Sequence, residues 1–308
     1  MECEWNEAET ELAFQTDRMT GVLVANPDSR PCHCVRQLRD RITGALLSPD
    51  TGAMRHAGAF TLFRAYARNG WLTELRNTTA HVTRRDDGVE LVWDPTVRHR
   101  ARVSMRIKIM ESGAIDADIE VEGHGSYADY ELLFSNYVAP ELRGGLFVKR
   151  ELFGSTDDCE RIAVTDSPVF RGMYTFFPRD ERAANVMTDG RGQRGRHYWR
   201  VACGRPYACP MALAANDSML VALMGRPQDV SSVGVTYWAD DDSADGVAQH
   251  HAQYLSLFAR DLHPGEGWRT RVRLALGHES PDPHDQLALF ESFMEGDDGG
   301  PATFEVLP

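Results

Sequence analysis

A strand-like segment at residues 127–140 carries polar side chains among apolar ones. It reads Tyr-Ala-Asp-Tyr-Glu-Leu-Leu-Phe-Ser-Asn-Tyr-Val-Ala-Pro. Because side chains alternate between the two faces of a strand, Glu131, Ser135 and Tyr137 share one face and Asn136 lies on the other. A carboxyl group beside a ligand can act as a general acid or base, whereas a buried one needs a partner in any case. Glu131 is therefore either a catalytic candidate or an internally paired residue at a sheet edge.

Two arginines stand in successive strand candidates, Arg64 in Thr-Leu-Phe-Arg-Ala-Tyr and Arg76 in Glu-Leu-Arg-Asn, with Trp71 between them. Two guanidinium groups that converge beside an aromatic ring would bind a carboxylate or a row of sugar hydroxyls. The alternative is a pair of structural ion pairs, for instance with Glu74 or Glu131.

The segment from residue 189 to residue 199 reads Asp-Gly-Arg-Gly-Gln-Arg-Gly-Arg-His-Tyr-Trp. Its position between strand candidates predicts a binding loop or a strand entry beside a pocket, since loops on a rigid sheet carry much of protein function. Asp189, Arg196, His197 and Trp199 are its candidate ligand-binding residues. The segment lacks the Lys-Ser/Thr ending and the following helix of a phosphate loop. A solvated basic loop is the alternative.

Other clusters point to no cofactor and no metal. The Cys-His-Cys run at 32–34, with Cys203 and Cys209, offers four possible ligands, but its spacing matches no zinc motif. The acidic run at 240–246 lacks the spacing and the terminal Glu of an EF-hand and is expected to be a solvated turn. The sequence contains no Ser-His-Asp order, zincin motif or dinucleotide fingerprint.

The elements that must position these residues are β-strands. Residues 102–110 and 114–122 alternate with period two, and the outward faces are basic in the first run and acidic in the second. A three-residue loop with Gly113 in the left-handed conformation predicts a hairpin whose register pairs Ile109 with Ile115. The same register pairs three basic residues with three acidic ones: Lys108 with Asp116, Arg106 with Asp118, and Arg102 with Glu122.

Similar short apolar runs, separated by Gly, Pro, Asn or Asp, continue from Gly21 to Leu276. Many strands without intervening helices predict an all-β sandwich or barrel. Asp282 is a plausible N-cap and Pro283 a first helical residue, so a C-terminal helix is expected over 282–294. We expect one domain, with residues 1–19 as an N-terminal arm or short helix and residues 20–277 as the β-sandwich.

The composition limits the class of partner. The chain has 308 residues, of which 42% are hydrophobic, and a formal net charge of −13. This content is enough for a real core, and the acidic balance disfavours nucleic acid or an anionic membrane as a partner. The first residues have no apolar run and no stretch approaches the length of a membrane span, so a cytoplasmic protein with reduced cysteines is expected.

The strand succession, the segment Leu-Phe-Ser-Asn-Tyr-Val-Ala-Pro at 133–140 and the segment Asp-Leu-His-Pro-Gly-Glu-Gly-Trp at 261–268 resemble the galactose mutarotase-like group. This group includes aldose 1-epimerases and the sandwich domains of several polysaccharide lyases and glycosidases. The resemblance covers most of residues 20–277 and implies a large antiparallel β-supersandwich that binds a carbohydrate.

The same resemblance implies a His as general acid and a Glu as general base, and this sequence departs from that pattern. Asn136 stands where a His is expected, and residues 251–259 contain no Glu. Asparagine cannot transfer a proton at neutral pH, so a substitute pair is required, for which His197 and Glu131 are the candidates.

These observations lead to one hypothesis with two alternatives. The protein is expected to bind a carbohydrate or sugar acid on a concave sheet face, and to modify it in an epimerase-like reaction with Glu131 and His197 as the catalytic pair. The expected substrate-binding residues are Arg64, Arg76, Asn136, Tyr137, Asp189, Arg196 and Trp199, with Tyr137 or Trp199 stacked on a sugar ring. The alternatives are a non-catalytic binding module or interaction scaffold, and a polysaccharide lyase-like enzyme. The oligomeric state stays open.

Overall fold

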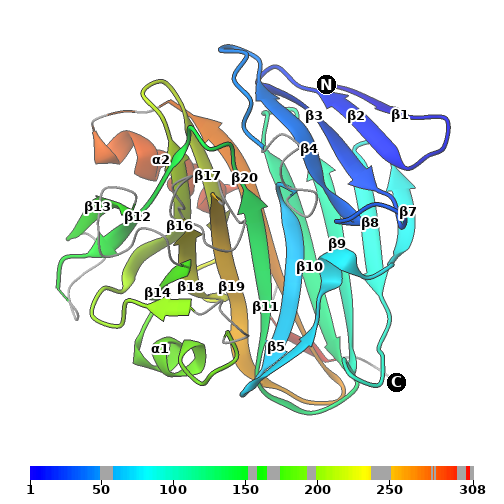
Figure 1. The fold of residues 1–308 in the computed structure, drawn as a ribbon, viewed down its shortest axis with the longest axis vertical. Helices are drawn as coiled ribbons and strands as arrows, with labels where there is room; N and C mark the ends of the chain where they lie inside the picture. The colour runs from blue at the N-terminus through cyan, green and yellow to red at the C-terminus, as the bar shows by residue number, and fades with distance from the viewer. Residues whose placement is uncertain are drawn as a thin grey trace, which may run out of the picture.

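The computed structural model describes residues 1–48, 58–151, 158–164, 174–192, 199–236, 251–278, 280, 282–296 and 303–305. Its strands form three sheets of four, seven and ten strands (Figure 1). Neighbouring strands are antiparallel except for the parallel pair at the edge of the seven-stranded sheet. The prediction of an all-β fold is therefore confirmed.

The small sheet contains, in order, β1 (Glu2–Trp5), β2 (Glu11–Gln15), β3 (Met19–Ala25) and β4 (His33–Asp40). The seven-stranded sheet has the order β15 (Trp199–Val201), β14 (Tyr174–Pro178), β18 (Val230–Thr236), β19 (Ala252–Leu262), β11 (Tyr127–Tyr137), β5 (Thr61–Ala67) and β6 (Gly70–Thr73).

The ten-stranded sheet has the order β13 (Cys159–Ala163), β12 (Arg143–Lys149), β16 (Tyr207–Ala215), β17 (Leu220–Gly225), β20 (Glu266–Gly277), β10 (Ile115–Gly123), β9 (Ala101–Ile109), β8 (Gly88–Trp93) and β7 (His81–Arg85), and β21 (Thr303–Glu305) pairs with β20. The helical elements are a 3-10 turn η1 (Leu75–Asn77), α1 (Glu181–Met187) and α2 (Pro283–Glu295).

One hydrophobic cluster joins all three sheets. It contains Leu12 of the small sheet, Leu62 and Phe134 of the seven-stranded sheet, and Ile119 and Leu274 of the ten-stranded sheet. Because the strands alternate, burial of this cluster leaves the opposite face of each large sheet for other contacts. Figure 1 shows strands β1–β4 at one end of the molecule, beside β7 and β8, and α1 at the other end.

The predicted hairpin is confirmed in register and in turn geometry. Ile109 pairs with Ile115 and Lys108 with Asp116 across β9 and β10, and Gly113 has a φ of 80°. A left-handed residue at this position closes a three-residue hairpin loop, and glycine adopts that conformation without a steric penalty.

The predicted register is confirmed, with Lys108 opposite Asp116, Arg106 opposite Asp118 and Arg102 opposite Glu122, but Asp116 and Asp118 also bond to arginines of β20, which lies on the other side of β10. Asp116 Oδ1 accepts a 2.6 Å hydrogen bond from Arg273 Nε, and Asp118 Oδ1 accepts one of the same length from Arg271. Lys108 instead lies 3.8 Å from Asp87. The acidic face of β10 therefore joins β10 to β20, a strand that is more than 140 residues away in the printed sequence.

Two local expectations are corrected. Residues 1–19 were expected to form an arm or a short helix, but they contain β1 and β2, because Leu12 and Phe14 alternate with polar neighbours and enter the main core. Arg76 was placed in a strand, but it lies in the 3-10 turn η1 that follows β6.

The C-terminal helix is confirmed as α2. The Asp282 side chain accepts a hydrogen bond from the His284 amide, and Pro283 is the first helical residue. Phe293 packs against Met211, Leu213 and other residues of the ten-stranded sheet on the face opposite the main core. In the part of the chain that the structure describes, no helix has both the length and the apolar character needed to cross a membrane.

Two buried histidines make stability depend on pH. Burial lowers the pKa of His33 to about 3 and that of His99 to about 4, against 6.5 in the unfolded chain. His99 also contacts the Tyr130 hydroxyl at 2.8 Å. The stabilising contribution of a neutral buried histidine is complete above pH 6.5. It is lost as the pH falls toward the folded pKa, because the unfolded chain then binds the proton more strongly.

We expect the free energy of unfolding to fall by about 2 kcal/mol for each of these histidines between pH 7 and pH 5. Urea unfolding at a series of pH values measures this slope. His99→Gln should make the slope shallower, while the core truncation Leu91→Ala should lower stability at every pH without changing the slope. Parallel profiles for His99→Gln and the unmodified protein would contradict the assignment.

Candidate functional site

A β-bulge in β5 places two consecutive side chains on one face of the seven-stranded sheet. Leu133 pairs with Arg64 and Phe134 with Leu62, so Phe63 is the extra residue. Leu62 and Ala65 enter the main core, whereas Phe63 belongs to a second cluster on the opposite face. The bulge therefore brings Phe63 and Arg64 to the same side, which regular alternation forbids.

We call this side of the seven-stranded sheet the aromatic face. It carries Phe63, Tyr66, Tyr137, Phe176 and Tyr254, with the half-buried Trp71, Tyr174 and Trp199 packed against them. Tyr137 and Tyr254 are perpendicular with ring centroids 6.4 Å apart, and Trp199 lies 4.7 Å from Phe176 and 5.2 Å from Tyr66. The rings thus form one continuous contact network across the sheet.

Arg64 and Arg76, the arginine pair, meet at the β5 and β6 end of this face. The Arg64 guanidinium lies 4.0 Å from the Phe63 ring centroid and 4.1 Å from that of Trp71, and Arg76 lies 3.9 Å from Phe63. Both contact Glu74 Oε1, at 3.5 Å and 3.2 Å. Arg76 also donates a 3.4 Å hydrogen bond to the Tyr137 hydroxyl. Stacking fixes the planes of the guanidinium groups, so their donors are oriented before any ligand arrives.

The tyrosines around the arginine pair stay protonated at neutral pH. Burial raises the pKa of Tyr66 to about 12, although a hydrogen bond from Arg64 opposes the shift. Burial likewise raises the pKa of Tyr174 and of Tyr254. Neutral phenol groups can both donate and accept hydrogen bonds, as a polyhydroxylated ligand requires.

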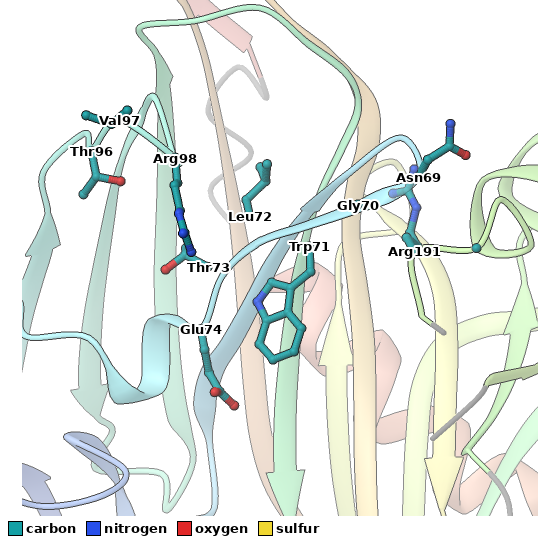
Figure 2. Close-up of a pocket in the computed structure, with 11 residues that line it drawn as sticks. Asn69, Gly70, Trp71, Leu72, Thr73, Glu74, Thr96, Val97, Arg98 and Arg191 are labelled. Atoms are coloured by element: carbon teal, nitrogen blue, oxygen red, sulfur yellow. The ribbon is translucent and has the colours of Figure 1, made fainter. Parts of the chain in front are cut away.

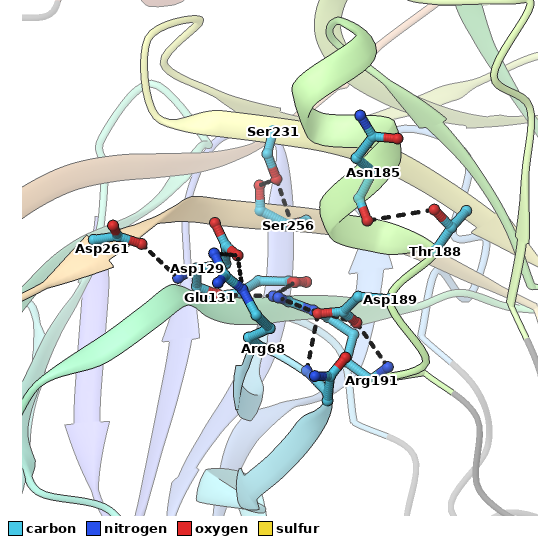
Figure 3. Close-up of polar contacts among 11 residues, drawn as sticks. Arg68, Asp129, Glu131, Asn185, Thr188, Asp189, Arg191, Ser231, Ser256 and Asp261 are labelled. Carbon is cyan, nitrogen blue, oxygen red and sulfur yellow. Dashed lines mark hydrogen bonds and ion pairs between the residues drawn. The ribbon is translucent and has the colours of Figure 1, made fainter.

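A buried ion-pair network lies elsewhere on the same face (Figure 3). Arg191 Nη1 donates 2.8 Å hydrogen bonds to Glu131 Oε2 and to the Asp129 carbonyl, and both the Arg191 and Glu131 side chains are 0% exposed. Arg191 Nη2 also donates to Asp189 Oδ2. Asp189 Oδ2 in turn accepts from the Asn69 amide, so the network ties the residues after α1 to the β5–β6 turn.

The two carboxyl groups of this network are shifted in opposite directions. Burial raises the pKa of Glu131 above its usual value, and Arg191 and Ser256 offset only part of this effect. Burial also disfavours the charge on Asp189, but hydrogen bonds from Arg191 and from the Asn69 amide outweigh it and lower the pKa. Asp189 is therefore the better ion-pair partner of Arg191 in acid.

Asn136, predicted to bind substrate, faces the core side of β11. Its Oδ1 accepts a 3.0 Å hydrogen bond from the Phe60 amide, and its Nδ2 donates one of 2.6 Å to Gln253 Oε1. Gln253 Nε2 donates to the carbonyls of Ala212 and Val221 in the ten-stranded sheet. The structure thus does not bring Asn136 to the arginine pair, because it lies on the opposite face of β11 from Tyr137.

The structure brings together Arg64, Arg76 and Tyr137, and it joins Glu131 to Asp189 through Arg191. Trp199 lies on the same face, whereas the predicted residues Arg196 and His197 lie outside the described residues, as does the acidic run at 240–246. Sequence reasoning did not select Arg191. The available signal was the position of Arg191 two residues after Asp189. At this spacing the Asp189 side chain can accept a hydrogen bond from the Arg191 amide in a turn.

Within the described ranges, no three His, Cys, Asp or Glu side chains are arranged to hold a metal ion. All six cysteines are free thiols, and burial raises the pKa of Cys34 to about 11, so it is protonated at neutral pH.

A groove of about 840 Å³ runs along β6 (Figure 2). Its lining includes Trp71 and Glu74, which also contact the arginine pair. The residues at its two ends are Gly190–Arg191 and Thr96–Arg98, and Val97 is 96% exposed. The groove is thus an open surface next to the arginine pair.

The buried pair of Arg191 and Glu131 makes a testable contribution to stability. Arg191→Met should lower the free energy of unfolding by about 3–5 kcal/mol, because it leaves the Glu131 carboxylate buried without a partner. The double variant Arg191→Met/Glu131→Leu should recover most of that loss, since it removes both charges. Denaturant unfolding measures both.

Arg68→Met is the matched control, because Arg68 forms an ion pair with Asp129 but its side chain is 57% exposed. It should change stability little. A double variant that is as unstable as Arg191→Met would show that the arginine acts by packing and not by compensating Glu131.

Comparisons with solved structures identify the fold. No family model and no curated protein matches the sequence. Among solved structures, galactose 1-epimerase from Lactobacillus acidophilus is similar over 88% of this chain and 95% of its own, with a TM-score of 0.51 and 8% identity. The GalM/aldose epimerase homologue from C. elegans is similar over 88% of this chain and 99% of its own, with a TM-score of 0.50 and 8% identity.

Identities this low carry information about the fold alone. The similarity extends over nearly the whole length of both solved structures, and this chain is built almost entirely of antiparallel sheets. The chain has the galactose mutarotase-like fold.

Proposed function

We propose that the aromatic face binds a carbohydrate, with a sugar acid as the preferred ligand. The observation that carries the proposal is the arginine pair: two stacked guanidinium groups, oriented by Phe63 and Trp71, converge on a single carboxylate. A ligand carboxylate or a pair of hydroxyls is the complement of such an arrangement.

The surrounding residues suit a sugar as well. Tyr137 presents a hydroxyl beside Arg76, and the half-buried Trp71, Tyr174 and Trp199 supply aromatic surface for the C–H faces of a sugar ring. The solved structures similar to this chain are named as a galactose 1-epimerase and an aldose epimerase homologue, which agrees with a carbohydrate ligand.

Turnover of the ligand is a second proposal, and the raised pKa of Glu131 favours it. Burial raises the pKa of Glu131, which brings this carboxyl group closer to the pH at which a general acid or base is most efficient. Glu131 would act with His197 as an acid–base pair for epimerisation or elimination at a sugar carbon. Arg191 donates to Glu131 Oε2 and holds this carboxyl group in place. Asp189 would then orient Arg191, while Arg196 would contact the ligand.

A non-catalytic scaffold would use Arg64, Arg76 and Glu131 only to satisfy one another. Glu131 is paired with Arg191, whereas the contacts of Arg64 and Arg76 with Glu74 are those that the alternative of structural ion pairs predicts. A binding module without turnover would keep the arginine pair and would tolerate the loss of His197.

Thermal unfolding against neutral sugars, uronic acids and unsaturated oligosaccharides tests the proposal. A ligand at one hundred times its dissociation constant should stabilise the folded state by about 2.7 kcal/mol, which raises Tm by several degrees. We expect the uronic acids to give the largest shift, and Arg64→Ala to weaken their binding at least tenfold.

Arg102→Ala is the matched control, because Arg102 is an exposed arginine of β9 in the other large sheet. It should leave every shift unchanged. The absence of a shift with all sugars would remove the proposal, and equal loss in both variants would show that the arginine pair is not the site. With a bound sugar identified, His197→Gln separates turnover from binding: it should abolish conversion and leave the thermal shift.

A further inference from the structure

We propose that the groove along β6 holds further units of an acidic oligosaccharide, one unit of which occupies the arginine pair. This inference rests on the proposed function and adds the length of the ligand to it. The site would then prefer a chain of several sugar acids to a free monosaccharide.

The groove and the arginine pair are continuous through shared residues. Trp71 lines the groove and stacks on Arg64, and Glu74 lines the groove and contacts both arginines. Figure 2 shows these two side chains on the same side of the segment that starts with β6. A ligand unit held by Arg64 therefore lies next to the groove, where the rest of a chain can follow.

The size of the groove exceeds what one sugar needs. Its volume of about 840 Å³ lies in the upper part of the range of roughly 300–1,000 Å³ that is usual for ligand pockets. The lining mixes hydrogen-bonding side chains, among them Asn69, Thr73 and Thr96, with the apolar Leu72 and Val97. Hydroxyl groups and C–H faces alternate along an oligosaccharide, so this mixture suits it.

The backbone of β6 supplies further polar groups. Strand β6 is an edge strand of the seven-stranded sheet, and its only strand partner among the described residues is β5. Its outer edge therefore presents amide and carbonyl groups toward the groove. A peptide strand would fit this edge poorly, because β6 has four residues and its pairing shifts register after Trp71. Individual sugar hydroxyls do not require a regular ladder.

The charge of the groove favours an acidic chain. Arg98 is exposed and lies at the end of the groove opposite Arg191. Figure 2 shows the Arg98 side chain directed toward Thr73. Arg64 lies beside the groove, where it contacts Glu74, so a cation stands at each of two positions along the ligand. Arg191 also lines the groove, but its side chain is buried between Glu131 and Asp189. Two separated cations complement the regularly spaced carboxylates of an oligouronide.

Titration calorimetry with galacturonic, glucuronic and mannuronic acids, each as the monomer and as its tetramer, tests the inference. We expect one tetramer to bind at least tenfold more tightly than its monomer. Arg98→Ala should weaken the tetramer about tenfold and leave the monomer unchanged, whereas Arg64→Ala should weaken both. Arg102→Ala should change neither. Both substituted arginines are on the surface or half-buried, and the thermal unfolding of each variant reports whether it folds.

The outcomes separate this inference from the proposed function. If monomer and tetramer bind equally, or if Arg98→Ala leaves the tetramer unchanged, the groove is not part of the site while the arginine pair still binds a sugar acid. If neither form of any uronic acid binds, both proposals fail.

Discussion

The side chains of β5 stop alternating at Phe63, and the arrangement of the aromatic face depends on that one extra residue. Regular alternation would place Phe63 and Arg64 on opposite faces of β5, and one of the two side chains would be directed into the main core. With the bulge, Arg64 stacks on Phe63. It also contacts Trp71 of β6 and Glu74, the residue that follows β6. The core beneath keeps Leu62 and Ala65, so the local irregularity does not interrupt hydrophobic packing. Bulges of this kind commonly redirect side chains beside binding sites.

The buried network of Arg191, Glu131 and Asp189 positions the segment that follows α1. The Arg191 side chain is fully buried and reaches Glu131 of β11, while Asp189 accepts from the Asn69 amide in the β5–β6 turn, where Asn69 has a left-handed φ of 59°. Burying ions is costly, and it is tolerated only when each charge has close partners. The network thereby links three segments that are far apart in the sequence.

The sequence was sufficient to predict most of the fold because strand alternation and turn residues are local signals. The β9–β10 hairpin follows from residues 102–122 alone, and the N-cap of α2 from Asp282 and Pro283. The face of β11 that carries Glu131 and Tyr137 follows from alternation as well.

What could not be predicted depends on contacts between distant segments. The pairing of Asp116 with Arg273 requires β20 to lie beside β10. Arg64 and Arg76 were expected to converge, but the 3-10 turn that carries Arg76 has no clear local signal. Asn136 was assigned to the ligand because its position resembles a family motif, whereas its partner Gln253 lies in another strand. Arg191 was missed because its role depends on Glu131, sixty residues earlier.

The amide bridge of Asn136 and Gln253 has a mechanical consequence. It connects Phe60, on the chain entering β5, with the carbonyls of Ala212 and Val221 in the opposite sheet. Sliding one large sheet over the other by a single residue would break these bonds and leave buried amides unsatisfied. The bridge therefore opposes sliding of the two large sheets beneath the aromatic face. Strand β6, at the margin beside the arginine pair, lies outside this bridge.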